Sequence, residues 1–449
     1  MAGRFARRRE RRRFESATAE AREQLAAEME DVLRRHVMQA WFPRCIDRKQ
    51  GGYFPDFDRR WRLHGSQPKM LEFQARQVRA AARLALAYPG EGDWAEYAVH
   101  GYENLRTTMW DATTGGWYWM VERDGRPSAG HTKHAHSTSY AVQSCALVYV
   151  VTGDAGALEM AEEGLRWFDQ HAHDDEHGGY HSWLLRDGAV VRRADELPPG
   201  TQGVDPLNHD VGLKNENVHG DWLEALFEVR SVSSLPLVEA RLREIADIHL
   251  RHITTIGGEV HHTFHDDWTP QPCIERFGYG ALSAHRLLDV GGLPGYELLN
   301  ERAKLVLDHT IRQGWRKDGG LLYAGPPGVP VELQGTDLRV PRRAWWVQLE
   351  AIRALAMAWA EFPGEADRYW RRMVRLWDFF KRDLVDDQYG GIYEWPTRDM
   401  PLLGRPIGPR NGWASRKGHS WKDASHDVDC LLRCIRVLRE GRTPAARPS

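Results

Sequence analysis

The chain has 449 residues, 42% of them hydrophobic, and its 61 basic and 63 acidic side chains leave a net charge of −2. A charge balance this close to zero gives no field that would draw nucleic acid or an anionic membrane, so a small neutral ligand is the better expectation. The five cysteines are odd in number and scattered, which indicates a reduced, cytoplasmic protein with buried thiols rather than a disulfide framework.

The chain begins with an arginine-rich stretch, residues 1–15, which we expect to be a solvated, frayed start. It is not followed by an apolar segment, so it does not resemble a secretory signal. Nothing in the sequence approaches the ~18 consecutive apolar residues that span a bilayer. We expect residues 16–440 to form a single catalytic domain and residues 441–449 to form a disordered tail.

A Gly-Gly turn followed by β-prone residues recurs six times along the chain. Glycine relieves the steric cost of a positive φ angle in a tight turn, and the residues that follow suit a short extended segment. The repeat therefore predicts a structural turn that separates similar units. The copies begin at Gly51, Gly115, Gly178, Gly257, Gly319 and Gly390, and four of them follow an aspartate at Asp47, Asp111, Asp174 or Asp386.

Two kinds of helical segment alternate with these turns. The segment before each turn, such as 94–110, mixes apolar and charged residues at helical spacing, which is typical of an exposed helix. The segment after each turn, such as 133–153, is apolar in its C-terminal half and should be buried. Twelve helices in six such hairpins predict an all-α fold, an (α/α)6 barrel with short β segments in its loops. The long loops 196–212 and 323–341 should shape a binding site.

The inner helices begin with polar and aromatic residues that a buried helix would not favour. If six such ends converge, they form a mouth in which aromatic faces pack on a sugar and polar groups bind its hydroxyls. We therefore expect a small-molecule carbohydrate as the partner. The candidate site residues are Arg76, His136, Asn217, His219, Asp221, Glu224, Tyr279, Trp345, Trp346, Gln348, Glu350, Trp421 and His426.

Five motifs in order make the chain similar to a known family. They are QARQVR (74–79), NVHGDWLEAL (217–226), DDWTP (266–270), RAWWVQLEAI (343–352) and KGHSWKDASHDV (417–428). In these motifs the chain resembles the N-acylglucosamine 2-epimerase family, which includes cellobiose 2-epimerases and aldose–ketose isomerases acting on mannose and sulfoquinovose. The resemblance spans about residues 30 to 440 and implies an (α/α)6-barrel enzyme that is a monomer or homodimer.

The resemblance also implies a mechanism without cofactor or metal. His426 would be the acid or base that moves a proton next to the sugar carbonyl, and Arg76 would stabilise the resulting enediolate. Trp346 would supply a platform for the sugar, and Glu224 would hold hydroxyls or orient a neighbour. The expected activity is 2-epimerisation or aldose–ketose isomerisation of a mono- or disaccharide.

The chain departs from the family pattern at several positions, and one departure is HDVD (426–429) in place of the family's His-Asn-x-Arg. Tyr279 stands where the family has its second catalytic histidine, Leu282 where it has the accompanying glutamate, and Asp221 where it has a histidine on the third inner helix. Epimerisation uses two faces of the sugar and is best served by two acid/base groups, whereas isomerisation on one face needs only one. His219 or His136 could supply a relocated second group, so epimerase and isomerase both stay open.

Two other classes of function also stay open. A glycoside or uronyl hydrolase of the same barrel type would need two carboxylates about 5 to 10 Å apart across the scissile bond, and a pseudoenzyme would bind sugar without turning it over. The carboxylates available to a hydrolase include Asp205, Asp210, Asp221, Glu224 and Asp427.

The histidine-rich stretch 171–183, HAHDDEHGGYHSW, at first suggests a metal site. It contains the third Gly-Gly turn, with Asp174 and Gly178 at the fixed positions of the repeat, and no sister turn carries the same histidines. We therefore predict a structural turn without a metal, from which only His181 could face a cleft.

Overall fold

The computed structural model describes residues 16–128, 132–198, 210–317, 319–325, 343–396, 401–402, 405–406 and 416–441. The expected frayed N-terminus, the tail from residue 442 and most of the two long loops lie outside these residues. The chain divides into two compact units. The N-terminal unit is Trp41–Glu275 with Arg416–Ser425, and the C-terminal unit is the described part of Met1–Ala40, Arg276–Ser415 and His426–Ala446. The predicted single domain spans both and stays a prediction.

In the N-terminal unit, inner and outer helices alternate along the chain as predicted. Each inner helix follows a two-residue strand, which pairs antiparallel with the strand after the next turn: β1 with β2, β3 with β4 and β5 with β6. The inner helices are α4 (Leu71–Ala87), α6 (Ala135–Thr152) and α8 (Glu216–Val229), and the outer ones are α5 (Trp94–Asn104), α7 (Ala155–Ala172) and α9 (Pro236–Ile248). The strands are β1 (Lys69–Met70), β2 (Met120–Val121), β3 (Lys133–His134), β4 (Trp183–Leu184), β5 (Lys214–Asn215) and β6 (Thr263–Phe264).

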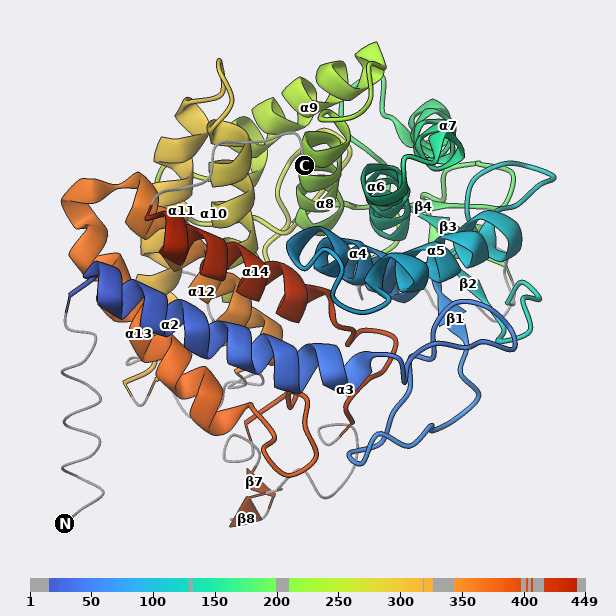
Figure 1. Ribbon diagram of the computed structural model, residues 1–449. Coiled ribbons are helices and arrows are strands. Elements are labelled where there is room, and N and C mark those ends of the chain that lie inside the picture. Colours follow the sequence, from blue (N-terminus) through green and yellow to red (C-terminus); the bar gives the residue numbers. More distant parts are fainter. Residues whose placement is uncertain are drawn as a thin grey trace. The chain divides into compact units, whose positions relative to one another are not determined.

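The C-terminal unit has the same alternation of inner and outer helices, and its outer helices include α2 from the start of the chain. The N-terminal helix α2 lies beside the last helix α14, where Arg22 Nη1 donates to the Leu438 carbonyl at 3.1 Å (Figure 1). The inner helices are α10 (Phe277–Gly291), α12 (Trp345–Glu361) and α14 (Ser425–Glu440), and the outer ones are α2 (Ala19–Val32), α11 (Leu298–Gly314) and α13 (Ala366–Asp383). Two short strands, β7 (Pro401–Leu402) and β8 (Arg405–Pro406), pair with each other. Short α3 (Gln39–Trp41), π-helical turns at Leu33–Met38, Leu105–Met109 and His249–Ile253, and 3₁₀ turns at Ala194–Glu196 and Pro363–Glu365 complete the described elements.

The Gly-Gly repeat forms the predicted turn. In the third copy, Gly178 and Gly179 have φ angles of 75° and 74°, and one antiparallel bridge joins His173 to Tyr180. Asp174 Oδ1 accepts from the backbone N–H groups of residues 176 and 177, which caps the turn. The other turns close with equivalent bridges, so the sequence repeat is a repeat of structure.

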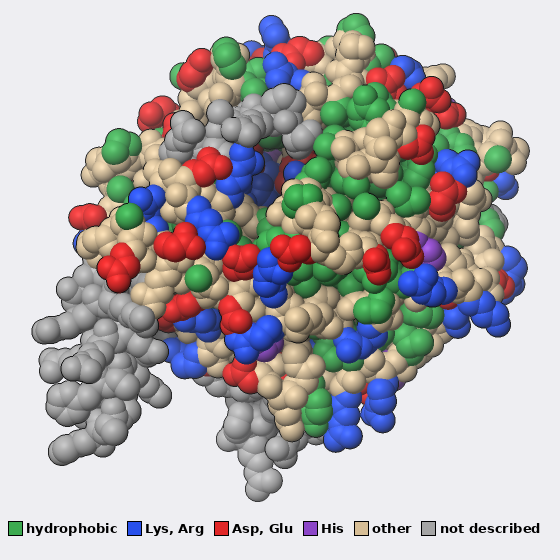
Figure 2. Space-filling view, in the orientation of Figure 1, with side chains coloured by type: hydrophobic (Ala, Val, Ile, Leu, Met, Phe, Trp, Pro, Cys, Tyr) green, Lys and Arg blue, Asp and Glu red, His purple; other side chains and the backbone are tan. Residues whose placement is uncertain are grey.

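Burial separates the inner from the outer helices. Helix α6 is buried from Ala135 to Val148, whereas α7 buries a stripe that includes Ala157, Ala161, Leu165 and Phe168. A stripe at this spacing is the core-facing side of an exposed helix. On the face drawn in Figure 2, acidic and basic side chains are interspersed. Among the described helices, none is long and apolar enough to cross a membrane.

Candidate active site

Polar side chains line one face of the inner helices of the N-terminal unit. On α4, Glu72, Arg76, Arg79 and Arg83 follow one another at intervals of three or four residues, which places them on the same side of the helix. Their partners come from α6, α8 and the segment 416–425. The face is therefore a row of ion pairs and hydrogen bonds rather than an apolar core.

Arg76 is fixed by acidic and hydroxyl groups. Its Nη1 donates to Glu72 Oε1 at 2.6 Å, and its Nε donates to Ser425 Oγ at 3.0 Å and lies 3.5 Å from Asp423 Oδ2. The guanidinium carbon lies 4.9 Å from the centre of the Tyr140 ring. Burial by itself would lower the pKa of Arg76, but nearby groups, Asp423 foremost, outweigh burial and raise the pKa above its ordinary value. Arg76 is a permanent, oriented cation.

His136 lies between two carboxylates. Its Nε2 is 2.9 Å from Glu72 Oε2, and its Nδ1 contacts Asp221 Oδ2. The Tyr140 hydroxyl donates to the other oxygen of Asp221 at 3.0 Å. Burial by itself would lower the pKa of His136, but Glu72 and Asp221 together raise it to about 10, so the ring is a cation at neutral pH. Because both nitrogens are engaged, His136 joins α4, α6 and α8.

Glu224, a predicted catalytic residue, binds a cation one helix turn beyond this cluster. Arg79 Nη2 donates to Glu224 Oε1 at 2.7 Å, and Arg79 Nη1 donates to Gln143 Oε1 at 2.7 Å. All three side chains are buried. Glu224 therefore serves as the counter-ion of a buried guanidinium.

Three further predicted residues of this unit have different settings. His219 Nε2 accepts from the Tyr180 N–H at 3.0 Å and its Nδ1 donates to the Asn215 carbonyl at 2.7 Å, so the ring holds the third turn. Burial lowers the pKa of His219 to about 3 and keeps it neutral. Asn217 is buried at the N-terminal end of α8, and Trp421 is partly exposed.

In the C-terminal unit, Glu350 of α12 bridges two imidazoles. Its Oε1 is 2.5 Å from His426 Nδ1, and its Oε2 is 2.7 Å from His285 Nε2. Burial by itself would raise the pKa of Glu350, but the two histidines hold it well below its ordinary value. The His426 side chain is 13% exposed and that of His285 is fully buried. In the tautomer that donates Nδ1–H to Glu350, the proton-accepting nitrogen of His426 is Nε2.

Aromatic rings surround His426. Trp346, which is partly exposed, stacks on the imidazole with ring centres 5.7 Å apart and an interplanar angle of 27°, while Trp345 meets the imidazole edge-on at 6.2 Å. The buried Tyr279 ring lies 5.7 Å from Trp346. Tyr279 is thus next to the ring that stacks on His426.

Gln348, predicted to bind substrate, hydrogen-bonds through its side-chain amide to the backbone of the fifth turn. Its Oε1 accepts from the Leu321 N–H at 2.7 Å and its Nε2 donates to the Leu321 carbonyl at 2.9 Å. Gln74 makes the same pair of bonds with Tyr53 at the first turn. The geometry gives Gln348 a structural role, and substrate binding by it stays a prediction.

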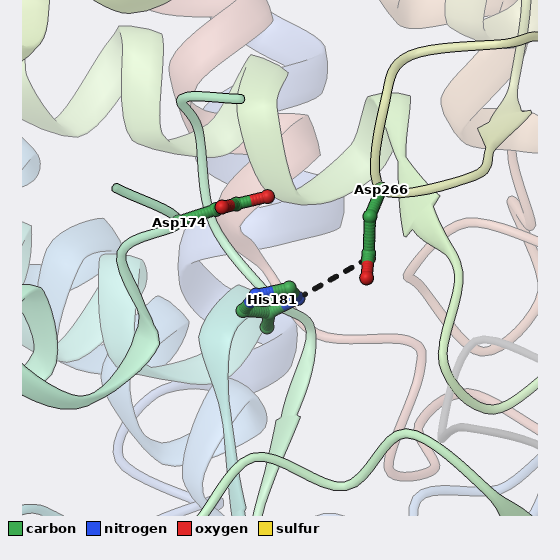
Figure 3. A group of neighbouring side chains, drawn as sticks. All are labelled: Asp174, His181 and Asp266. Atoms are coloured by element: carbon green, nitrogen blue, oxygen red, sulfur yellow. Dashed lines mark ion pairs between the residues drawn. The ribbon is translucent and has the colours of Figure 1, made fainter. Parts of the chain in front are cut away.

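The histidine-rich third turn brings Asp174, His181 and Asp266 together (Figure 3). One ligand atom from each lies within 4.8 Å of the others. Lys214 Nζ, however, donates to Asp174 Oδ2 at 2.6 Å and to the main-chain carbonyl of Asp266 at 2.8 Å. Burial lowers the pKa of His181 to about 4, so it adds no charge at neutral pH. An ammonium group already supplies the positive charge that a metal would bring.

Comparison with known proteins gives the family. The profile of N-acylglucosamine 2-epimerase (GlcNAc 2-epimerase) matches residues 52–152, 121–197 and 207–405, which together are most of the chain. The chain belongs to the N-acylglucosamine 2-epimerase family. The resemblance that the motifs indicated is therefore confirmed.

Sugar epimerases and isomerases match this chain along 81% to 99% of their own length. A cellobiose 2-epimerase of Bacteroides fragilis is 22% identical over 425 residues, 93% of this chain and 99% of the relative. A D-mannose isomerase of Marinomonas mediterranea is 23% identical over 82% of this chain and 90% of its own. A cellobiose 2-epimerase of Eubacterium cellulosolvens is 35% identical over 77% of this chain and 81% of its own.

Solved structures confirm the predicted fold class. Cellobiose 2-epimerase from Spirochaeta thermophila superimposes with a TM-score of 0.76 at 23% identity, covering 93% of this chain and 98% of its own. A GH76 α-mannanase of Bacteroides thetaiotaomicron, at 8% identity, and an unsaturated glucuronyl hydrolase of Bacillus, at 14%, each give 0.55, which shows a shared fold alone. The chain is an all-α protein of the (α/α)6-barrel class.

The sequence did not single out three residues that contact predicted site residues: Glu72 and Asp423, which lie beside Arg76, and His285, which binds Glu350. Glu72 could have been found, since it precedes Arg76 by one helical turn on the same face. His285 is an imidazole in an otherwise apolar inner helix, which is also a usable signal. Asp423 lies before α14, and no periodicity shows that this segment folds back on Arg76.

Proposed function

We propose that the protein is a cofactor-free sugar isomerase, either a 2-epimerase or an aldose–ketose isomerase, acting on a mono- or disaccharide. The relatives named above are sugar epimerases and isomerases, which supports this class. The observation that carries the proposal is the ionised Glu350 carboxylate bound to a partly exposed His426 under the face of Trp346. The proposed reaction needs a base and an aromatic platform close to the same sugar ring, and His426 and Trp346 are in contact in this way.

In the proposed mechanism, the sugar ring opens and His426 Nε2 removes the proton from C2. The electron pair of the C–H bond moves toward the carbonyl oxygen and forms a cis-enediolate, while Glu350 stabilises the imidazolium. Return of a proton to the opposite face of C2 gives the epimer. Return of the same proton to C1, with transfer of the proton on O2 to O1, gives the ketose.

We assign enediolate stabilisation to Arg76, following the family motif in which it stands. Its geometry suits the role, because Glu72 and Asp423 orient the guanidinium and keep it charged. A donor that needs no reorientation during the reaction stabilises developing charge best. Sugar binding by Asn217, Asp221, Trp345 and Trp421, and the monomeric or homodimeric state, stay predictions.

The contacts of two of the candidate carboxylates, Asp221 and Glu224, favour an isomerase over a hydrolase, whereas Asp205 lies outside the described residues. A general acid of a glycosidase must hold a proton near neutral pH. Asp221 is instead bound to His136 and Tyr140, and Glu224 to Arg79, which stabilise the ionised forms. Hydrolysis is therefore the poorer fit to these contacts.

Incubation of the purified protein with a panel of aldoses, ketoses and disaccharides in D2O tests the proposal. We expect deuterium at C2 of an epimer, or at C1 or C2 of an aldose–ketose pair, and loss of exchange by at least about 100-fold in His426→Ala. Cleavage of a disaccharide would instead identify a hydrolase, and binding without exchange a pseudoenzyme. An unchanged exchange rate in His426→Ala would refute the mechanism.

A further inference from the structure

Glu350 has two imidazole partners, and the proposed mechanism uses only one of them. His285 lies on α10, six residues beyond Tyr279, and points its Nε2 at Glu350 Oε2 from 2.7 Å. Its side chain is fully buried, so it has no access to a sugar. The other carboxylate oxygen binds His426. Each oxygen of the carboxylate therefore has one imidazole partner.

We propose that His285 is a positioning residue for proton transfer: it holds the Glu350 carboxylate by one oxygen so that the other fixes the ring and tautomer of His426. The inference rests on the proposed function of His426. A carboxylate bound at one oxygen only could rotate about its terminal bond, and the His426 ring would rotate with it. With both oxygens engaged, His426 Nδ1 stays the donor to Glu350 and Nε2 stays the proton acceptor of the proposed reaction.

We assign this positioning role to His285 and not to the other charged or titratable side chains near the Glu350 carboxylate. Arg353 of α12 and Arg433 of α14 both bind the Asp289 carboxylate of α10, which offsets one of their two positive charges. The Cys430 thiol of α14 lies beside Glu350, and burial raises its pKa well above the ordinary value, so it stays neutral. Tyr279 of α10 packs on Trp346.

Replacement of His285 by Phe tests the proposal by two readouts. Glu350 would then share its charge with His426 alone and bind the protonated ring more tightly, so the acid limb of the kcat–pH profile should move up by about one pH unit. We expect kcat to fall about tenfold at pH 7 with little change in KM. His285→Gln, which keeps an N–H donor, should restore most of the profile.

Nitrogen-15 NMR of the ring nitrogens gives a readout that needs no sugar. In the unaltered protein, we expect His285 Nε2 and His426 Nδ1 both to carry protons, and in His285→Phe we expect the His426 signals to become those of mixed tautomers. This result would support positioning even if no sugar is turned over, so failure of the proposed function and failure of this inference are distinguishable.

The matched control is His309→Phe, which removes a second buried imidazole of the same unit that binds Arg312 instead of Glu350. It should change neither the pH profile nor the His426 signals. An unprotonated His285 Nε2 in the unaltered protein, measurable without any variant, would overturn the proposal. So would a His285→Phe protein with the original profile and His426 tautomer.

Discussion

The buried guanidinium of Arg76 has little freedom to reorganise, which makes it a sensitive test of the proposed mechanism. Lysine at this position keeps the charge but cannot reach Glu72 and Ser425 with the planar geometry that Arg76 uses. We expect Arg76→Lys to lower kcat by about 100-fold, the usual cost of one donor to a developing oxyanion, with a smaller change in KM. Steady-state kinetics on the sugar identified by deuterium exchange measures both.

The control for that variant is Arg126→Lys, at an exposed arginine that pairs with Asp124. It should leave both parameters unchanged. If Arg76→Lys kept the original kcat, enediolate stabilisation would have to be assigned to another group.

His136 is expected to make the folded state less stable as the pH rises into the alkaline range. Its pKa is raised from about 6.5 in the unfolded chain to about 10 in the folded one. The imidazolium therefore stabilises the folded state fully below about pH 6.5, and this contribution declines as the pH rises toward 10. We expect Tm to fall between pH 6 and pH 10 more steeply in the unaltered protein than in His136→Gln. Calorimetry at a series of pH values measures the difference, with the exposed His64→Gln as control.

At the scale of elements, the sequence predicts helices and turns well because their signals are local. The hydrophobic pattern predicts that α6 is buried and that α7 is exposed on one side, and the Gly-Gly repeat locates the turns. Contacts between elements are not local. Nothing in the sequence shows that the Gln348 amide hydrogen-bonds to the Leu321 backbone, or that His285 and His426 both bind Glu350. Sequence patterns therefore predict the helices and turns that carry the candidate residues, but not the partners of those residues.

The turns themselves can be tested by a pair of alanine variants with nearly the same backbone angle. Gly179 has a φ of 74° and Gly153 a φ of 73°. A Cβ at residue 179 would lie 2.6 Å from His219 Nε2, whereas one at residue 153 would meet nothing within 4 Å. We expect Gly153→Ala to cost about 1 to 2 kcal/mol for the left-handed backbone alone. Gly179→Ala should cost a further 1 to 3 kcal/mol, roughly, for overpacking.

Urea denaturation measures both variants, and their m values should match that of the unaltered protein. Equal losses of stability in the two variants would mean that the third turn is not held against His219 as described.

For the molecule as a whole, the charge pairing predicts activity and stability that do not depend on a metal. In the described residues, the one group of side chains with metal-ligand geometry is Asp174, His181 and Asp266. Lys214 Nζ is already bonded to Asp174 and to the Asp266 carbonyl, so a divalent ion would have to displace a buried ammonium. We expect dialysis against EDTA to leave both Tm and the deuterium exchange rate unchanged.

Lys214→Met sharpens this prediction. Without the ammonium, Asp174 loses its cation and the protein should be less stable, by about 3 to 5 kcal/mol for a broken buried pair. The same change removes Lys214 from Asp174, one of the three side chains whose candidate ligand atoms lie within 4.8 Å of one another. Added Zn²⁺ should therefore raise the Tm of Lys214→Met while leaving that of the unaltered protein unchanged, which thermal denaturation with and without the ion measures. A loss of Tm or of exchange in the unaltered protein after EDTA would show that a metal, and not Lys214, holds the third turn together.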